Sequence, residues 1–170
     1  MKTRIKLNVL IVLIFMFTPV LALALAPFQL TAATECTLRN KDDQKRLELV
    51  DGAWKFKGRE TGTAIMECAI HPLALGVGSI GGFVVFFQDS DGAATATSAK
   101  VTLRKRTFPG GVVSIGSYIT DEAATTDETA GFEPVSEVVG GELWYYRVEL
   151  KRAAKEQQIN FFAILALDNE

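Results

Sequence analysis

The sequence has little of what many enzymes use for catalysis. Its 170 residues include one histidine and two cysteines. No serine lies in a GxSxG turn, which presents the nucleophile in many hydrolases. The histidine, His71, precedes Pro72, and proline cannot donate a hydrogen bond to a sheet, so this pair is typical of a strand end. We therefore expect no triad of nucleophile, histidine and acid.

A surplus of positive charge is also missing. The chain has 18 Lys and Arg residues against 20 Asp and Glu residues. Loss of the first 24 residues, which include Lys2, Arg4 and Lys6, would leave 15 basic residues against 20 acidic ones. Proteins that bind nucleic acid neutralise phosphates with a basic surface, and anionic membrane surfaces attract basic segments in the same way. Neither kind of partner is expected.

The N-terminus is typical of a secretory signal peptide. Three basic residues precede a long apolar run from Leu7 to Ala26, which ends in small residues. A cut after Ala24 fits best, and cuts after Ala26 or Ala33 are alternatives. We predict a signal peptide at residues 1–24 and a mature protein that is periplasmic or extracellular and spans no membrane. The alternative is an uncleaved anchor, because the run is just long enough to cross a bilayer.

Both cysteines, Cys36 and Cys68, lie after this segment. An even count in an oxidising compartment predicts one disulfide, which would stabilise the fold by about 3–4 kcal/mol in the chain-entropy model. It would join an N-terminal segment, residues 25–46, to a single domain at residues 47–170. Two free thiols or half of a metal site are weaker alternatives, since only one histidine could complete such a site.

The clearest structural signal is the stretch at 142–152, ELWYYRVELKR. Its alternation predicts a half-buried strand, with Trp144 and Tyr146 facing the core and Tyr145 and Arg147 facing solvent. No long stretch has the three- and four-residue spacing of an amphipathic helix.

Other strands follow from similar patterns. Asp51-Gly52 is a preferred two-residue hairpin turn, and the polar run at 39–46 is expected to be a loop. Residues 83–87 and 159–167 are apolar at successive positions, which predicts central strands covered on both faces. Further strands are expected at residues 47–50, 54–57, 63–70, 100–106, 112–120 and 135–139. The fold class predicted is all-β, an antiparallel β-sandwich or jelly roll of about eight or nine strands.

From about residue 63 onward the order of features supports a resemblance. A corner at His71-Pro72-Leu73 leads to an apolar strand that ends at Asp89, then VTLRKR at 101–106, LWYYRVEL at 143–150 and a closing apolar strand. This part of the chain resembles a broad group of exported bacterial β-sandwich proteins of uncharacterised function. The resemblance implies a fold and a compartment, and it transfers no catalytic residues. The Cys36 segment and the Trp54 hairpin depart from the pattern.

Three residues are candidates for ligand binding. Tyr145 is expected on the wet face beside Arg147, where an aromatic ring can stack on a sugar. Trp54 is the third candidate, although it shares a strand face with Phe56 and a place in the core is its alternative.

Asp89 and Asp91 precede Gly92 and form a candidate Ca²⁺ turn. The third oxygen ligand and the later glutamate of an EF-hand loop are missing. Solvated turn residues are therefore the alternative, and no other cofactor is expected.

Three functions remain open from the sequence. The first is an exported non-enzymatic β-sandwich that acts by binding or assembly at the cell envelope or outside the cell, with a protein or glycan partner. The second is a carbohydrate-binding module. The third is a hydrolase with a carboxylate site that the sequence does not locate.

Overall fold

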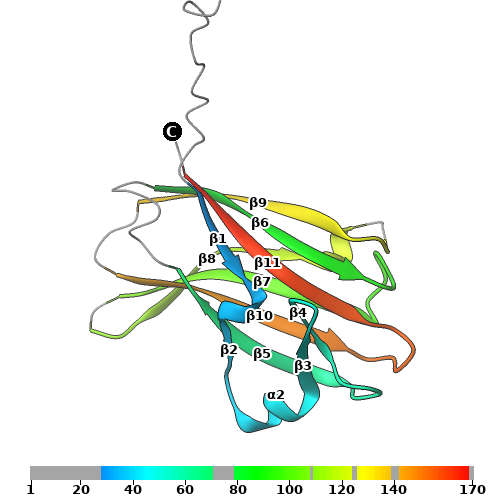
Figure 1. The fold of residues 1–170 in the computed structure, drawn as a ribbon. Coiled ribbons are helices and arrows are strands. Elements are labelled where there is room, and N and C mark those ends of the chain that lie inside the picture. The colour runs from blue at the N-terminus through cyan, green and yellow to red at the C-terminus, as the bar shows by residue number, and fades with distance from the viewer. Residues whose placement is uncertain (1–27, 71–78, 108, 124–125, 139–141, 169–170) are drawn as a thin grey trace, which may run out of the picture.

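In the computed structural model, the chain folds into two facing layers of antiparallel strands (Figure 1). The predicted signal peptide and His71 lie outside the described part of the chain. The described residues are 28–70, 79–107, 109–123, 126–138 and 142–168.

One layer, sheet A, runs in the order β3-β4-β11-β6-β9, and β1 also pairs with β11. Strand β4 pairs with β11 at Phe161, whereas β1 pairs with β11 between Ala163 and Leu167. Figure 1 shows β1 (blue) beside β11 (red). The bounds are β1 (Phe28–Ala32), β3 (Leu47–Val50), β4 (Ala53–Phe56), β6 (Ser79–Asp89), β9 (Thr129–Val138) and β11 (Ile159–Asp168).

The second layer, sheet B, runs in the order β2-β5-β10-β7-β8. Its strands are β2 (Cys36–Leu38), β5 (Gly62–Ala69), β7 (Thr97–Arg106), β8 (Val112–Ile119) and β10 (Leu143–Arg152). Three short helical elements complete the described part: η1 (Ala33–Glu35), α2 (Lys41–Arg46) and η3 (Thr120–Glu122). Within that part, no helix is long and apolar enough to cross a membrane.

The core lies between the two sheets, and strand β10 shows why. Trp144, Tyr146, Val148 and Leu150 are at most 1% exposed, as the alternation predicts. The Tyr146 ring lies 5.4 Å from the ring of Phe83 on β6, so an aromatic contact joins the layers. Burial raises the pKa of the Tyr146 hydroxyl.

The predicted fold class is confirmed, with eleven strands in the described residues instead of eight or nine. The additional strands β1 and β2 lie in the segment at 25–46. The predicted hairpin is present, and both turn residues have positive φ, 52° at Asp51 and 80° at Gly52. The polar run at 39–46 is not simply a loop, because most of it forms α2. The Asn40 side chain caps this helix by accepting hydrogen bonds of 2.9 Å from the amides of Asp42 and Asp43.

The predicted disulfide is also confirmed. Cys36 and Cys68 are paired residues of β2 and β5, and their Cα atoms lie 4.1 Å apart. Both side chains are buried, so the bond holds the N-terminal segment to sheet B from within the core.

Candidate functional site

A polar groove crosses the outer face of sheet B. Its cavity volume is about 290 Å³, and strands β7, β8 and β10 supply its walls. Residues from these three strands lie side by side because β7 lies between β8 and β10 in the sheet. The residues that line the groove are Lys100, Thr102, Arg104, Ser114, Ile115, Gly116, Ser117 and Glu149.

The groove combines both signs of charge with hydroxyl groups. Arg147, beside the groove, lies with its Nε 3.2 Å from Oε1 of Glu149, and both side chains are partly buried. Nε of Arg104 is buried and has no hydrogen-bond partner among the described residues. An unpaired buried donor costs free energy until a partner satisfies it. Arg104 as a whole lines the groove and is partly exposed, so the side chain can donate hydrogen bonds to a ligand there.

Tyr145 lies on the outer face of sheet B, but the prediction that it faces solvent is wrong, because its side chain is buried. Its neighbours across the strands are Ala69 on β5 and Arg104 on β7, and only 8% of its surface is exposed. A central strand has neighbours on both sides, which covers the ring more than alternation alone indicates. Tyr145 does not line the groove, and its ligand role stays a prediction.

Trp54 lies in the other layer, on β4, so the structure does not bring it together with Tyr145 and Arg147. Its Nε1 donates a hydrogen bond of 2.7 Å to the carbonyl of Ala33, and its ring packs against the core. These contacts fix the β3–β4 hairpin to η1. A ligand role for Trp54 stays a prediction.

Asp89 and Asp91 belong to a hydrogen-bonded cluster that sequence spacing alone does not reveal. The Thr97 hydroxyl contacts a carboxylate oxygen of each aspartate. The Thr120 hydroxyl donates to Oδ2 of Asp89 at 2.6 Å, and the amides of Ala96 and Thr97 donate to Oδ2 of Asp91 at 2.8 and 3.0 Å. The cluster joins β6 of sheet A to β7 of sheet B.

The two aspartates have opposite pKa shifts. Burial, followed by the contact with Asp91, raises the pKa of Asp89 from 3.8 to about 6. Burial also acts to raise the pKa of Asp91, but hydrogen bonds from Asp89, Thr97 and the backbone outweigh it and hold that pKa below 3.8. This pattern favours one proton shared by the pair.

The two aspartates that suggested a Ca²⁺ turn have a structural role in this cluster. Protein groups contact all four carboxylate oxygens of Asp89 and Asp91. Among the described residues, no group of three or more His, Cys, Asp or Glu residues is placed to hold a metal ion. Calcium binding by Asp89 and Asp91 stays a prediction, which a calcium titration followed by thermal unfolding tests.

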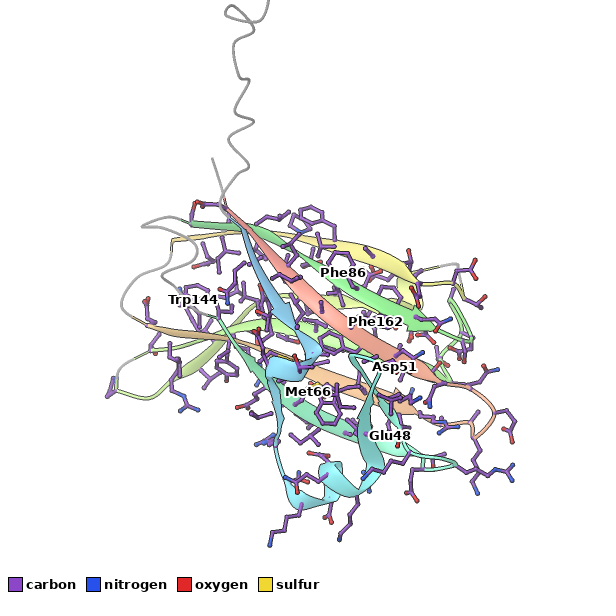
Figure 2. The ribbon with its side chains drawn as sticks, viewed as in Figure 1. Glu48, Asp51, Met66, Phe86, Trp144 and Phe162 are labelled. Atoms are coloured by element: carbon purple, nitrogen blue, oxygen red, sulfur yellow. A yellow bond between two sulfur atoms is a disulfide. The ribbon has the colours of Figure 1, made fainter. Side chains whose placement is uncertain are left out.

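Part of the outer face of sheet A is apolar, and sequence reasoning missed it. Phe86 and Phe162, labelled in Figure 2, belong to the neighbouring strands β6 and β11. They help to line a depression of about 590 Å³ together with Leu30 of β1, and Glu128 and Thr129 also line it. The prediction that residues 83–87 and 159–167 are covered on both faces is wrong for the described structure, since Phe86 and Phe162 stay partly exposed.

No known family model matches the chain, and no similar curated protein is found. Among solved structures, the chain is similar to a family two carbohydrate esterase from Cellvibrio japonicus (10% identity, TM-score 0.40), covering 85% of this chain and 35% of the esterase chain. It is also similar to the CBM36-1 domain of a multidomain xylanase from the hindgut metagenome of Trinervitermes trinervoides (9% identity, TM-score 0.48), covering 84% of this chain and 98% of that domain. A third similar structure is a family 29 carbohydrate-binding module from Piromyces equi (12% identity, TM-score 0.43), covering 82% of this chain and 89% of the module. Likenesses at this level assign no function to this chain.

Proposed function

We propose that this chain is a non-catalytic binding domain that works outside the cytoplasm. In this proposal, the groove of sheet B binds a hydroxyl-rich ligand of the oligosaccharide class. The observation that carries it is the lining of the groove, where guanidinium, carboxylate and hydroxyl groups lie side by side.

The chemistry of the lining matches that of a sugar. Each sugar hydroxyl both donates and accepts hydrogen bonds. Arg104 supplies only donors, Glu149 supplies acceptors, and Thr102 supplies a hydroxyl that can do either. The lining carries two basic side chains, Lys100 and Arg104, and one carboxylate, Glu149, whose partner across the strands is Lys100. A neutral polar ligand therefore suits the groove better than a polyamine.

Catalysis has less support than binding. Glycoside cleavage uses two carboxyl groups at a set separation across the substrate. Among the described residues that line the groove, Glu149 alone carries a carboxylate, and Arg147 is already paired with it. The hydrolase hypothesis therefore has no pair of catalytic acids in this groove.

The compartment is supported by the Cys36–Cys68 disulfide, since structural disulfides persist mainly in oxidising compartments. The predicted signal peptide points the same way. A periplasmic and an extracellular location both agree with these observations.

A glycan array probed with the exported protein tests the proposal. We expect hits whose affinity falls at least about tenfold in Arg104→Ala, a loss of about 1.4 kcal/mol of binding free energy. Arg59→Ala is the matched control, because Arg59 is exposed, pairs with Glu156, and neither of these two residues lines the groove. An array without hits, or binding that survives Arg104→Ala unchanged, would contradict the proposal.

A further inference from the structure

Charged side chains are distributed unevenly over the outer face of sheet B. Residues paired across neighbouring strands share a face of the sheet, so the pairing register defines rows of side chains that cross this face. One row contains Glu67, Arg147 and Thr102 on β5, β10 and β7. The row beside it contains Glu149 and Lys100 on β10 and β7. Each carboxylate in these two rows therefore has a basic residue as its partner on the adjacent strand.

The other end of this face carries positive charge without acidic partners. Arg104 is paired with Tyr145 on β10 and with Ser114 on β8, and both partners of Arg106 on these strands are apolar. Neither arginine forms a salt bridge with another described residue. The two lie two positions apart on one strand, which separates their Cα atoms by about 6.8 Å. This end of the face therefore has two adjacent cations that the protein itself leaves unbalanced.

The carboxylates of β9 do not balance this charge. Glu133 accepts a hydrogen bond of 3.3 Å from the amide of Ser117, but it is paired with the buried Phe83 and so belongs to the inner face of sheet A. Glu137 is bound to Lys105, with Oε2 3.0 Å from Nζ. The whole chain has 20 acidic residues against 18 basic ones, so the positive end of sheet B is a local feature.

We propose that the ligand of the groove is an acidic oligosaccharide, in which a uronic acid places its carboxylate at Arg104. This inference rests on the function proposed above and narrows it. The lining alone suits a neutral sugar, but Arg104 lines the groove at the end where Arg106 adds a second positive charge. A planar guanidinium can donate two parallel hydrogen bonds to a carboxylate. Thr102 and Ser117, which line the same groove, offer hydroxyls to the rest of the sugar.

Other charged ligands fit this face less well. Proteins that bind nucleic acid need a basic surface, whereas Glu67 and Glu149 lie on this face and would repel closely spaced phosphates. The same repulsion disfavours a densely sulfated polysaccharide, and a polyamine would be repelled by Arg104 and Arg106. A uronic acid combines one negative charge on the ring with neutral hydroxyls around it, which matches cations at one end of the groove and hydroxyl groups along it.

Isothermal titration calorimetry with matched ligands tests the inference. The probes are trisaccharides of galacturonic, glucuronic and mannuronic acid, each compared with its own methyl ester, which keeps the hydroxyls and removes the charge. We expect at least one acid to bind the exported protein at least about tenfold more tightly than its ester. Added salt should weaken the binding of this acid and leave that of its ester nearly unchanged, because salt screens charge.

Arg104→Gln removes the charge and keeps a hydrogen-bonding amide. It should weaken binding of the acid at least about tenfold and binding of the ester by less than about threefold. Arg106→Gln should act in the same direction with a smaller effect, because Arg106 is exposed and does not line the groove. Arg59→Gln is the matched control, since it removes the same charge from an exposed side chain outside the lining. Circular dichroism checks the fold of each variant.

The outcomes separate this inference from the proposed function. Esters that all bind as tightly as their acids would overturn the inference and leave a neutral sugar as the ligand. Tighter binding of carrageenan oligosaccharides, which carry sulfate and no carboxylate, would also overturn it. So would a loss of acid binding in Arg59→Gln as large as that in Arg104→Gln. If no glycan of either kind binds, the proposed function fails together with the inference.

Discussion

An apolar patch with Leu30, Phe86 and Phe162 lies on the outer face of sheet A, whereas a groove lined mostly by charged and hydroxyl side chains lies on the outer face of sheet B. Both sheets bury the same kind of inner face, so the core does not require this difference. A β-sandwich can fold when both of its outer faces are polar. An exposed apolar face, in contrast, carries a risk of aggregation. The contrast is one of surface chemistry: sheet B carries a polar groove and sheet A carries an apolar patch.

The largest difference between the layers is expected in how they hold the N-terminal segment. Sheet B holds it by the disulfide between β2 and β5, and sheet A holds it by the β1 ladder and the Trp54 hydrogen bond. Replacing Cys36 and Cys68 together by alanine should lower the free energy of unfolding by about 3–4 kcal/mol. Trp54→Phe, which removes one hydrogen bond, should lower it by about 1 kcal/mol.

Urea denaturation of the oxidised wild type and both variants measures this comparison. Equal losses from the two changes would mean that the disulfide stabilises the segment no more than the Trp54 hydrogen bond does. A loss below about 1 kcal/mol in the double variant would contradict the chain-entropy argument for this ring.

Much of the layered fold is predictable from local patterns. The alternation at 142–152 places Trp144 and Tyr146 in the core, and Asp51-Gly52 marks the hairpin, because both signals depend on neighbours in the sequence. Helix α2 was missed because six residues are too few to show helical periodicity, although Asn40 followed by two acidic residues is an N-cap signal.

The candidate site was not predictable, because it depends on which strands pair. Arg104, Ser117 and Glu149 meet only once β7 is known to lie between β8 and β10. Strand sequences determine which faces are apolar, but they do not say which element covers them. For this reason the apolar runs around Phe86 and Phe162 led to the wrong prediction of a cover on both faces.

The Asp89–Asp91 cluster, where the layers meet, should make stability depend on pH with opposite signs for the two residues. The pKa of Asp89 is raised from 3.8 to about 6 in the folded state. Its protonated form therefore stabilises the fold, fully below about pH 4 and progressively less as the pH rises through 6. Two pKa units correspond to at most about 3 kcal/mol. Asp89→Asn, which imitates the protonated acid, should stabilise the protein at pH 8 and have little effect at pH 4.

Asp91→Asn is expected to change the stability in the opposite direction to Asp89→Asn. The pKa of Asp91 is lowered, so its charged form stabilises the fold at neutral pH, and this stabilisation is lost as the pH falls through the folded-state pKa. The variant should be less stable than the wild type at pH 8, with a smaller difference in acid. Urea denaturation at several pH values measures both variants, and a change of the same sign in the two would contradict a shared proton.

A further comparison concerns the two faces of sheet A itself. A Cβ atom at Gly131 would lie 1.9 Å from the Tyr118 ring, which is 7% exposed and packed in the core. At Gly82 the atom would lie 2.4 Å from the exposed ring of Phe132 and 3.0 Å from the backbone carbonyl oxygen of Glu133. Gly131→Ala should lower the free energy of unfolding by about 1–3 kcal/mol, since a packed core cannot give way, and Gly82→Ala should lower it by less, because Phe132 can swing outward. Thermal unfolding of the two variants measures the difference.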